Sequence, residues 1–344
     1  GNSQLYHYEP IERLMALPGG KGYGDGSADS YAMGILVLYL LLGRLPLQDM
    51  TQENLTQRIL QMGSYNAFTN DLELPDTIHD FLRGTLNDVR HERWTMQQIG
   101  SWLEGKRFNL IAPSLPRDCS RSFHFIDQDF FSKRALAYAM YRDWDESVRR
   151  LPADKLVRWL ELCTTDQDIS GMMAKVLHVR EDAVPTVREL KDEDLAKAIA
   201  TLDPAGPLRY KNLAVNIDGL GTLLATLLRD GENVQLQTLL NLISGTLPNY
   251  ISSLTDRAAN PDVVHVIWKL QRVKMTLRIA GLGFGVERIL YDLNESMPCQ
   301  SPILLPHHVM SMKEALLTLD SIATDALRKH SLVDRHLAAF LASK

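Results

Sequence analysis

The most apolar stretch of the chain lies near its beginning. Its central part, Tyr31–Leu42 (YAMGILVLYLLL), carries no charge and has no separate polar face. A helix that is apolar in every direction is buried in a core or spans a membrane, and this run falls short of the roughly 20 residues that a span needs. We therefore expect a buried helix, capped by Ser27 or Asp29 at its start and ended by Gly43.

Most of the remaining chain has the spacing of amphipathic helices. Apolar residues recur every three or four positions, which predicts helices that pack on a shared core. We find no β-branched alternation long enough for a strand and no fixed repeat length, so we predict an all-α protein with an irregular helical bundle. The segments with helical period are 51–63, 74–87, 95–105, 130–151, 154–165, 192–202, 219–231, 233–247, 262–294, 311–330 and 333–344.

One segment interrupts this helical pattern. Arg107–Ser122 (RFNLIAPSLPRDCSRS) has two prolines and no helical period, which is typical of a linker. At 344 residues the chain is long enough for about two domains. We predict a first domain over about residues 1–108, a linker over 109–120 and an all-helical second domain over 121–344.

Charge and cysteine content narrow the protein class. The net charge is −5 and Lys and Arg are spread along the chain, which argues against nucleic acid as a partner. Cys119, Cys163 and Cys299 lie far apart without a CxxC spacing, so we predict buried thiols in a reducing cytosol and no disulfide framework. The start, GNSQLYHYEP, lacks the basic and apolar regions of a signal peptide, so we predict a cytoplasmic protein with no membrane span.

Three segments, in order, resemble the lower part of the protein kinase C-terminal lobe. Tyr8–Arg13 (YEPIER) is similar to the end of an activation segment, and the apolar run is similar to the lobe's central helix. Val89–Ile99 (VRHERWTMQQI) is similar to the segment that closes the lobe. The residues that match are Tyr8, Glu12, Asp29, Tyr31, Ala32, Gly34, Leu40, Gly43, Pro46, Leu47, Arg93, Trp94, Thr95, Gln98 and Ile99. This resemblance to the protein kinase-like superfamily, serine/threonine kinases or pseudokinases, covers about residues 6–103, and it implies a partial kinase-like lobe before the helical bundle.

The resemblance implies structural roles for three charged residues. In the family, the glutamate of the activation segment pairs with an arginine near the end of the lobe, and Glu12 and Arg93 match them. A solvated surface position for both is the alternative. The aspartate that starts the central helix accepts hydrogen bonds from the catalytic-loop backbone in the family, and Asp29 matches it. The upstream half of the lobe normally covers this helix, so Ile35, Leu38 and Leu42 need cover from an upstream segment, the helical domain or a partner.

The chain also departs from the family where activity is concerned. Ile11 replaces the usual proline, and Val89-Arg90 replaces the usual Asn-Pro. The chain has no Gly-rich loop with a strand lysine, no H-R-D loop and no D-F-G, the parts that hold ATP and magnesium and supply the base. We therefore predict no catalytic, cofactor-binding or metal-binding residue here. Because the sequence starts inside an activation segment, we expect the natural protein to continue upstream, where ATP and magnesium would bind if it is an active kinase.

Other motifs give weaker candidates. The glycines of Pro18–Ser27 and Ala280–Leu290 lack the preceding strand of a nucleotide loop. We interpret the first set as a turn and the second as a helix break or a small-residue face for close packing. His307 and His308 lack a third metal ligand, and Cys163 lacks a hydrolase signature. We predict core packing for the helical tryptophans, with an aromatic groove for a partner helix as the alternative. These tryptophans are Trp102, Trp144, Trp159 and Trp268.

Two functions follow from this sequence. The first is a pseudokinase-type regulatory or protein–protein interaction module that transfers no phosphate by itself and binds unidentified protein partners. The second is the C-terminal portion of an active serine/threonine protein kinase whose ATP-binding and catalytic motifs lie upstream. We favour the first for this chain because it lacks every catalytic motif. The compact kinase-like motifs and the unfamiliar helical extension suggest a bacterial signalling protein.

Overall fold

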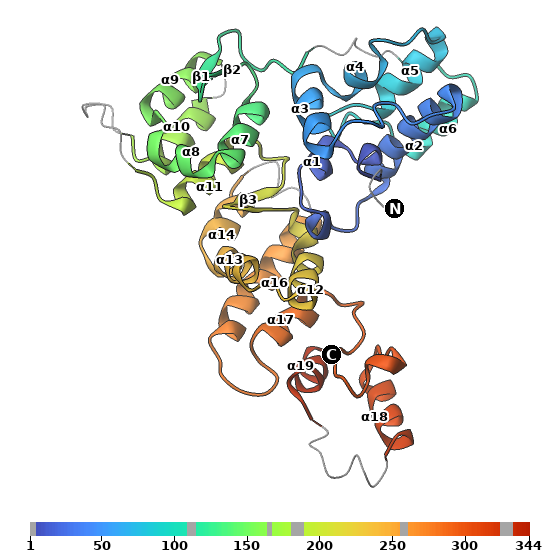
Figure 1. Cartoon of the computed structure of the whole chain (residues 1–344), viewed down its shortest axis with the longest axis vertical. Coiled ribbons are helices and arrows are strands. Elements are labelled where there is room, and N and C mark those ends of the chain that lie inside the picture. The colour runs from blue at the N-terminus through green and yellow to red at the C-terminus, as the bar shows by residue number, and fades with distance from the viewer. Residues whose placement is uncertain (1–4, 109–114, 164–166, 180–188, 255–260, 324–332) are drawn as a thin grey trace. The chain divides into compact units, whose positions relative to one another are not determined.

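The computed structural model describes all residues except 1–4, 109–114, 164–166, 180–188, 255–260 and 324–332, and it leaves out the side chains of Leu5, Gln167, Ser252 and 261–267. The described residues are mostly helical, which confirms the helical part of the fold prediction (Figure 1). They form two compact units, residues 1–216 (unit 1) and 217–344 (unit 2). The domain boundaries predicted at 109–120 fall inside unit 1 and stay a prediction, because this grouping of contacts does not test where domains begin.

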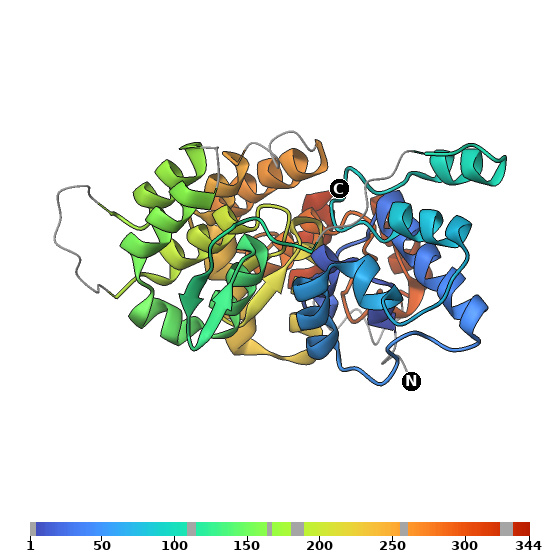
Figure 2. The same ribbon diagram turned by 90° about the horizontal axis from the view of Figure 1, so that it is seen from above.

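Unit 1 has two groups of helices. In the first group, α1 and α5 pack near α2 and share a core with it that includes Ile11, Ile35 and Leu82. In the second group, α7 to α11 lie side by side (Figures 1 and 2). The bounds are η1 Leu5–Tyr8, α1 Ile11–Leu14, η2 Pro18–Gly20, α2 Gly26–Leu42, α3 Gln52–Met62, α4 Ser64–Thr69, α5 Asp76–Thr85, α6 Met96–Leu103, α7 Lys133–Arg142, α8 Trp144–Arg150, α9 Ala153–Cys163, α10 Gln167–Val176 and α11 Asp192–Leu202.

The apolar run forms α2, and its cap differs from the predicted one. The Asp25 carboxylate accepts a hydrogen bond from the Ala28 amide at 3.0 Å, so neither Ser27 nor Asp29 caps the helix. Asp25 has extended backbone immediately before the first helical residue, which is the geometry that a cap requires. At the other end Gly43 adopts φ 67°, as the predicted stop requires.

Two short hairpins correct the all-α prediction. β1 (Phe123–Phe125) pairs antiparallel with β2 (Gln128–Phe130), and β3 (Leu208–Tyr210) pairs antiparallel with β4 (Leu213–Val215). In the first hairpin, both turn residues, Ile126 and Asp127, have positive φ, as a type I′ hairpin turn requires. Strands of three residues are too short to show an alternation in the sequence, which explains why pattern reasoning missed them.

A disulfide corrects the cysteine prediction. Cys119 and Cys163 are bonded to each other across 44 residues of chain, whereas Cys299 is a buried free thiol as expected. The bond joins the predicted linker to the end of α9, two segments whose proximity no spacing rule reveals. Disulfides persist mainly in oxidising compartments, so this bond gives no support to the predicted cytoplasmic location. The location stays a prediction.

Unit 2 is also built mainly from helices. α17 packs against α12, α16 and α19, and a separate apolar cluster gathers Tyr291, Leu304, Leu337 and Phe340. Within the helical segment predicted over 262–294, the chain leaves the helix after Leu277 and re-enters at Val286, where the sequence suggested a helix break. The bounds are η3 Ile217–Gly219, α12 Leu220–Asp230, α13 Asn233–Ser244, α14 Leu247–Ser252, α16 Pro261–Leu277, α17 Val286–Leu293, η4 Leu305–His307, α18 Met312–Ser321 and α19 Arg335–Ser343.

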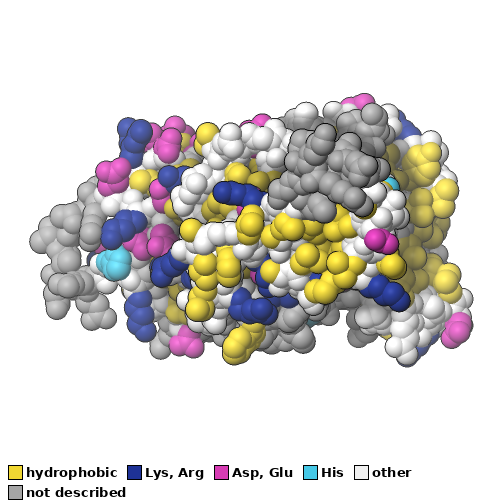
Figure 3. Space-filling view, turned by 90° about the horizontal axis from the view of Figure 1, so that it is seen from below, with side chains coloured by type: hydrophobic (Ala, Val, Ile, Leu, Met, Phe, Trp, Pro, Cys, Tyr) yellow, Lys and Arg dark blue, Asp and Glu magenta, His cyan; other side chains and the backbone are white. Residues whose placement is uncertain are grey.

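The surface of the molecule carries many exposed apolar side chains. Figure 3 shows one face on which hydrophobic side chains gather with Lys and Arg among them. Within the part of the chain that the structure describes, no helix combines the length and hydropathy needed to cross a membrane.

Candidate functional site

Glu12 and Arg93 meet in a buried ion pair. Glu12 lies on α1, and Arg93 lies in the segment that leads into α6. The Arg93 Nη1 and Nη2 atoms donate to the two Glu12 carboxylate oxygens at 3.0 and 3.3 Å. The Arg93 side chain is fully buried and that of Glu12 is 13% exposed, so the solvated alternative does not hold. The structure thus forms the predicted pair, while its role in a kinase lobe stays a prediction.

A chain of polar contacts extends from this pair into the core. The Arg93 guanidinium lies over the Tyr31 ring, and the Tyr31 hydroxyl donates to Ser64 Oγ at 3.0 Å. Ser64 in turn donates to the Asp88 carboxylate from its amide at 2.8 Å and from Oγ at 2.5 Å. Burial raises the pKa of Asp88 above its ordinary value, although the Ser64 bonds favour the ionised form. The network therefore ties α1, α2 and α4 through buried and half-buried groups.

A second ionic cluster ties the two helix groups of unit 1 together. Asp203 accepts from Arg134 Nε on α7 at 3.0 Å and from Arg209 Nη2 on β3 at 2.9 Å. Burial opposes ionisation of Asp203, but the two guanidinium groups hold its pKa below the ordinary value. Arg209 is fully buried, and its Nε and Nη1 have no hydrogen-bond partner within the structure as described. Its Nη2 also contacts Met15 Sδ at 3.0 Å, which brings β3 to the N-terminal helices.

Asp29 does not join either cluster. It is exposed in the first turn of α2, and no hydrogen bond or ion pair of the described residues links it to Glu12 or Arg93. The partner that the resemblance implies, a catalytic-loop backbone, is not encoded in this chain. The role of Asp29 therefore stays a prediction.

One side of α2 is open to solvent. Four apolar side chains there have exposed fractions of 41% to 69%: Leu36, Tyr39, Leu40 and Leu41. We call this set the open α2 face. The opposite side, with Tyr31, Ile35 and Leu38, is completely buried. The expectation that α2 is buried on every side is therefore wrong: η1 and α5 pack against α2, and these four side chains stay exposed.

The α2 side chains that the sequence analysis expected to be uncovered are not the ones exposed to solvent. Ile35 and Leu38 have no exposed surface and Leu42 is half-buried, so unit 1 itself covers them. A sequence that is apolar all round cannot show which side the protein leaves open. Only the packing of the neighbouring helices decides this.

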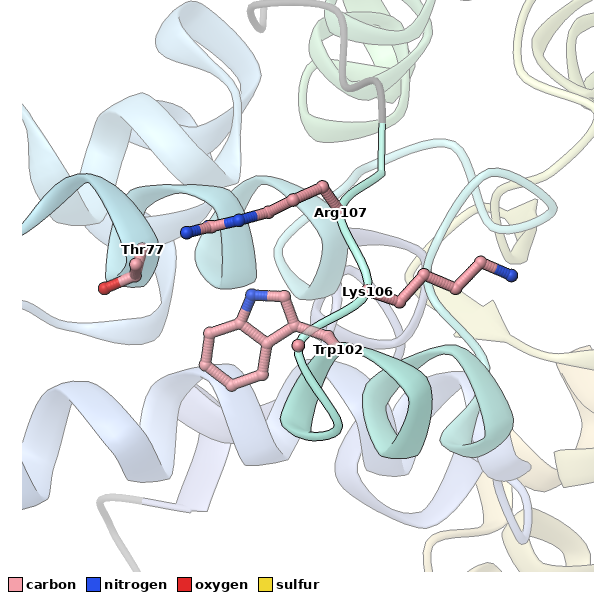
Figure 4. Close-up of a pocket in the computed structure, with 5 residues that line it drawn as sticks. Thr77, Trp102, Lys106 and Arg107 are labelled. Atoms are coloured by element: carbon pink, nitrogen blue, oxygen red, sulfur yellow. The ribbon is translucent and has the colours of Figure 1, made fainter.

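A small pocket lies beside Trp102 (Figure 4). Its volume is about 190 Å³, and Thr77, Trp102, Gly105, Lys106 and Arg107 line it. In Figure 4 the Arg107 side chain extends above the indole towards Thr77, and Lys106 points away. Arg107 is paired with Asp80 at 3.6 Å, and the volume is below the usual range of ligand pockets, so we assign no ligand to it.

The structure also places the tryptophans, histidines and glycines that the sequence analysis considered. Trp144 and Trp159 are buried and Trp102 is half-buried, whereas Trp268 is 67% exposed, so the core prediction is wrong for Trp268. His307 is exposed in η4, and the described residues hold no group of three His, Cys, Asp or Glu side chains placed to bind a metal ion. Gly-rich residues 278–285 form a turn between α16 and α17, as the helix-break interpretation expects.

Comparisons of this chain with family models, with curated proteins and with solved structures found no match. The kinase-like interpretation therefore depends on the three sequence segments and on the contacts described above.

Proposed function

We propose that this chain is a pseudokinase-type interaction module that binds another polypeptide on the open α2 face and transfers no phosphate by itself. The observation that carries the proposal is the row Leu36, Tyr39, Leu40 and Leu41 on one helix, exposed and uninterrupted by a polar residue on that side. Single exposed apolar residues are common, but a contiguous apolar patch marks a site of interaction.

The energetics favour an occupant for this face. Burying one large apolar side chain contributes about 1.5–3 kcal/mol, so covering the row gives a partner several such contributions. The other side of α2 is fixed by Tyr31, whose hydroxyl bonds to Ser64, and by the buried Ile35 and Leu38. A partner therefore meets a preformed surface, which lowers the ordering cost of binding.

A second function has one observation in its favour. The bidentate, buried pair of Glu12 and Arg93 is what the resemblance to protein kinases implies for the lower lobe. This supports the C-terminal portion of an active serine/threonine kinase, with nucleotide and magnesium bound upstream. The open α2 face would then be covered by the upstream part of the same chain.

Nucleotide binding separates the two functions. The thermal unfolding of this chain and of the natural full-length protein is measured with and without ATP and magnesium, with magnesium alone as the control. A ligand at about 100 times its Kd stabilises a protein by about 2.7 kcal/mol, which a thermal shift detects. The interaction module predicts no shift and no labelling of a protein substrate in either sample. A shift with phosphate transfer in the natural protein, but not in this chain, would favour the kinase.

A further inference from the structure

A second exposed apolar surface lies in unit 2, on α16 and the turn after it. Trp268 and Met275 are seven positions apart and lie on one side of α16, and Ile279 follows just after the end of the helix. Leu282 and Phe284 continue the set in the turn. Their exposed fractions run from 40% to 72%. We call these five residues the α16 surface.

The turn that carries Leu282 and Phe284 has a defined shape. The alternate glycines Gly281, Gly283 and Gly285 all have φ between 83° and 139°, a region that other residues rarely adopt. Gly283 is buried, and a Cβ there would lie 3.5 Å from the Ala338 carbonyl oxygen of α19. The backbone between the two apolar side chains is therefore held against α19, while the side chains themselves stay in solvent.

The charge around this surface differs from that of the whole chain. Residues 268–288 contain five Lys and Arg and a single acidic residue, Glu287, although the chain carries a net charge of −5. Lys269 pairs with Glu295, and Glu287 faces Arg335. Two of the other Lys and Arg residues in this segment, Arg272 and Arg278, are exposed, and the described residues show no ion pair for them.

We propose that the α16 surface binds peripherally to a membrane that contains anionic lipids. Trp268, Leu282 and Phe284 would enter the headgroup region, and Arg272 and Arg278 would contact lipid phosphates and carboxylates. Exposed Trp, Phe and Leu beside free cations are the combination that interfacial helices use. Trp268 and Met275 are about 10 Å apart along the helix, and the other apolar side chains continue into the turn, which fits an extended interface.

Lipid vesicles test this proposal, which is independent of the open α2 face in unit 1. Co-sedimentation compares phosphatidylcholine vesicles with vesicles that also contain phosphatidylserine, at about 0.1 M salt. We expect binding to the anionic vesicles only, and we expect added salt to weaken it. Reversing both charges with R272E/R278E lowers the partition coefficient about 10-fold or more, and L282S/F284S does the same.

Two control variants and an alternative ligand, an acidic peptide, complete the test. R149E/R150E on α8 and L103S/L162S in unit 1 change two exposed arginines and two exposed apolar residues elsewhere, and must bind vesicles as the parent does. Circular dichroism confirms that each variant is folded. Equal binding to neutral vesicles, no binding to either kind, or binding unchanged in R272E/R278E would overturn the proposal. Binding of an amphipathic Glu/Leu helical peptide without vesicle binding would also overturn it, and would assign the surface to an acidic protein partner.

Discussion

The two compact units place their charges differently. In unit 1, Arg93 and Arg209 are fully buried and each has a carboxylate partner, Glu12 and Asp203 respectively. In unit 2, the ion pair of Arg288 with Asp292 keeps 15% and 16% of the two side chains exposed, and the other pairs found among its described residues are more open on at least one side. Its buried polar groups are neutral, as with Asn294, which donates to the Gly221 and Leu290 carbonyls.

This difference predicts which substitutions should destabilise each unit. A buried charge that loses its partner is left unpaired in a low-dielectric interior, and this costs far more than the loss of an exposed pair. The partners in unit 1 are also distant in sequence, since Glu12 and Arg93 are 81 positions apart. Removing one partner of a buried pair should therefore strongly destabilise unit 1, whereas unit 2 should respond mainly to lost packing.

The largest effect is expected from Asp203→Ala. Arg134 and the fully buried Arg209 both lose their carboxylate, so we expect a loss of about 3–5 kcal/mol in the free energy of unfolding. Urea unfolding followed by tryptophan fluorescence measures it, because four of the five tryptophans lie in unit 1 and the fifth, Trp268, is exposed. Asp71→Ala is the control, since Asp71 is 89% exposed and pairs with Arg58 at 3.6 Å. Equal effects of the two variants would refute the ionic account.

Glu12→Gln should cost about 3 kcal/mol, at the lower end of the range for a broken buried pair. The amide keeps the shape of the side chain but leaves the Arg93 charge without a counter-charge, while Arg93 retains its bond to the Asn87 carbonyl at 2.9 Å. A double-mutant cycle with Arg93→Met measures the coupling. The double variant should be less destabilised than the sum of the single variants. Simple additivity would show that the pair contributes nothing specific.

The contribution of Asp203 should also depend on pH. Its pKa is held below the ordinary value in the folded state, so its stabilisation is present above the unfolded-state pKa and is lost as the pH falls through the folded-state pKa. The difference in stability between the parent and Asp203→Asn should therefore shrink below about pH 4. Groups common to both proteins, including Asp88, cancel in this difference. A difference that stays constant down to pH 2 would contradict the direction of the shift.

The smallest effect is expected in unit 2 from Ile289→Val. Ile289 is fully buried on α17, and removing one methylene should cost about 1 kcal/mol through lost packing. Hydrogen exchange of the α17 amides measures it locally, with Val234→Ala, at an exposed site on α13, as the control. A cost larger than that of Asp203→Ala would reverse the comparison between the units.

The helix ends of unit 1 could be predicted from local sequence signals. Its two ionic clusters could be predicted only in part. The stop at Gly43 and the Thr95 capping box follow from residue types at fixed offsets, and both are present in the structure. Glu12 and Arg93 could be paired only through the resemblance to kinases, because no local pattern joins residues so far apart. No sequence pattern pointed to the second ionic cluster, which consists of Asp203, Arg134 and Arg209. Each is a common charged residue, and only the fold shows that they lie together.

The open α2 face illustrates a limit of pattern reasoning. Periodicity locates the buried side of a helix only when the other side is polar, and α2 has apolar residues on both sides. The same holds for α16, where Trp268 was assigned to the core from its helical neighbours and is exposed. In both helices the residues that reasoning misplaced are the ones that now carry the proposed binding surfaces.

Site-specific photo-crosslinking from position 40 tests the proposed function most directly. A photoreactive residue replaces Leu40 in the natural protein in its own cells, and the same residue at Leu103, which is 73% exposed on α6, serves as the control. We predict a discrete crosslink from position 40 to a different polypeptide, lost when Leu36 is changed to Glu and absent from position 103. A crosslink only to an upstream part of the same chain, or none beyond the control, would contradict the interaction module.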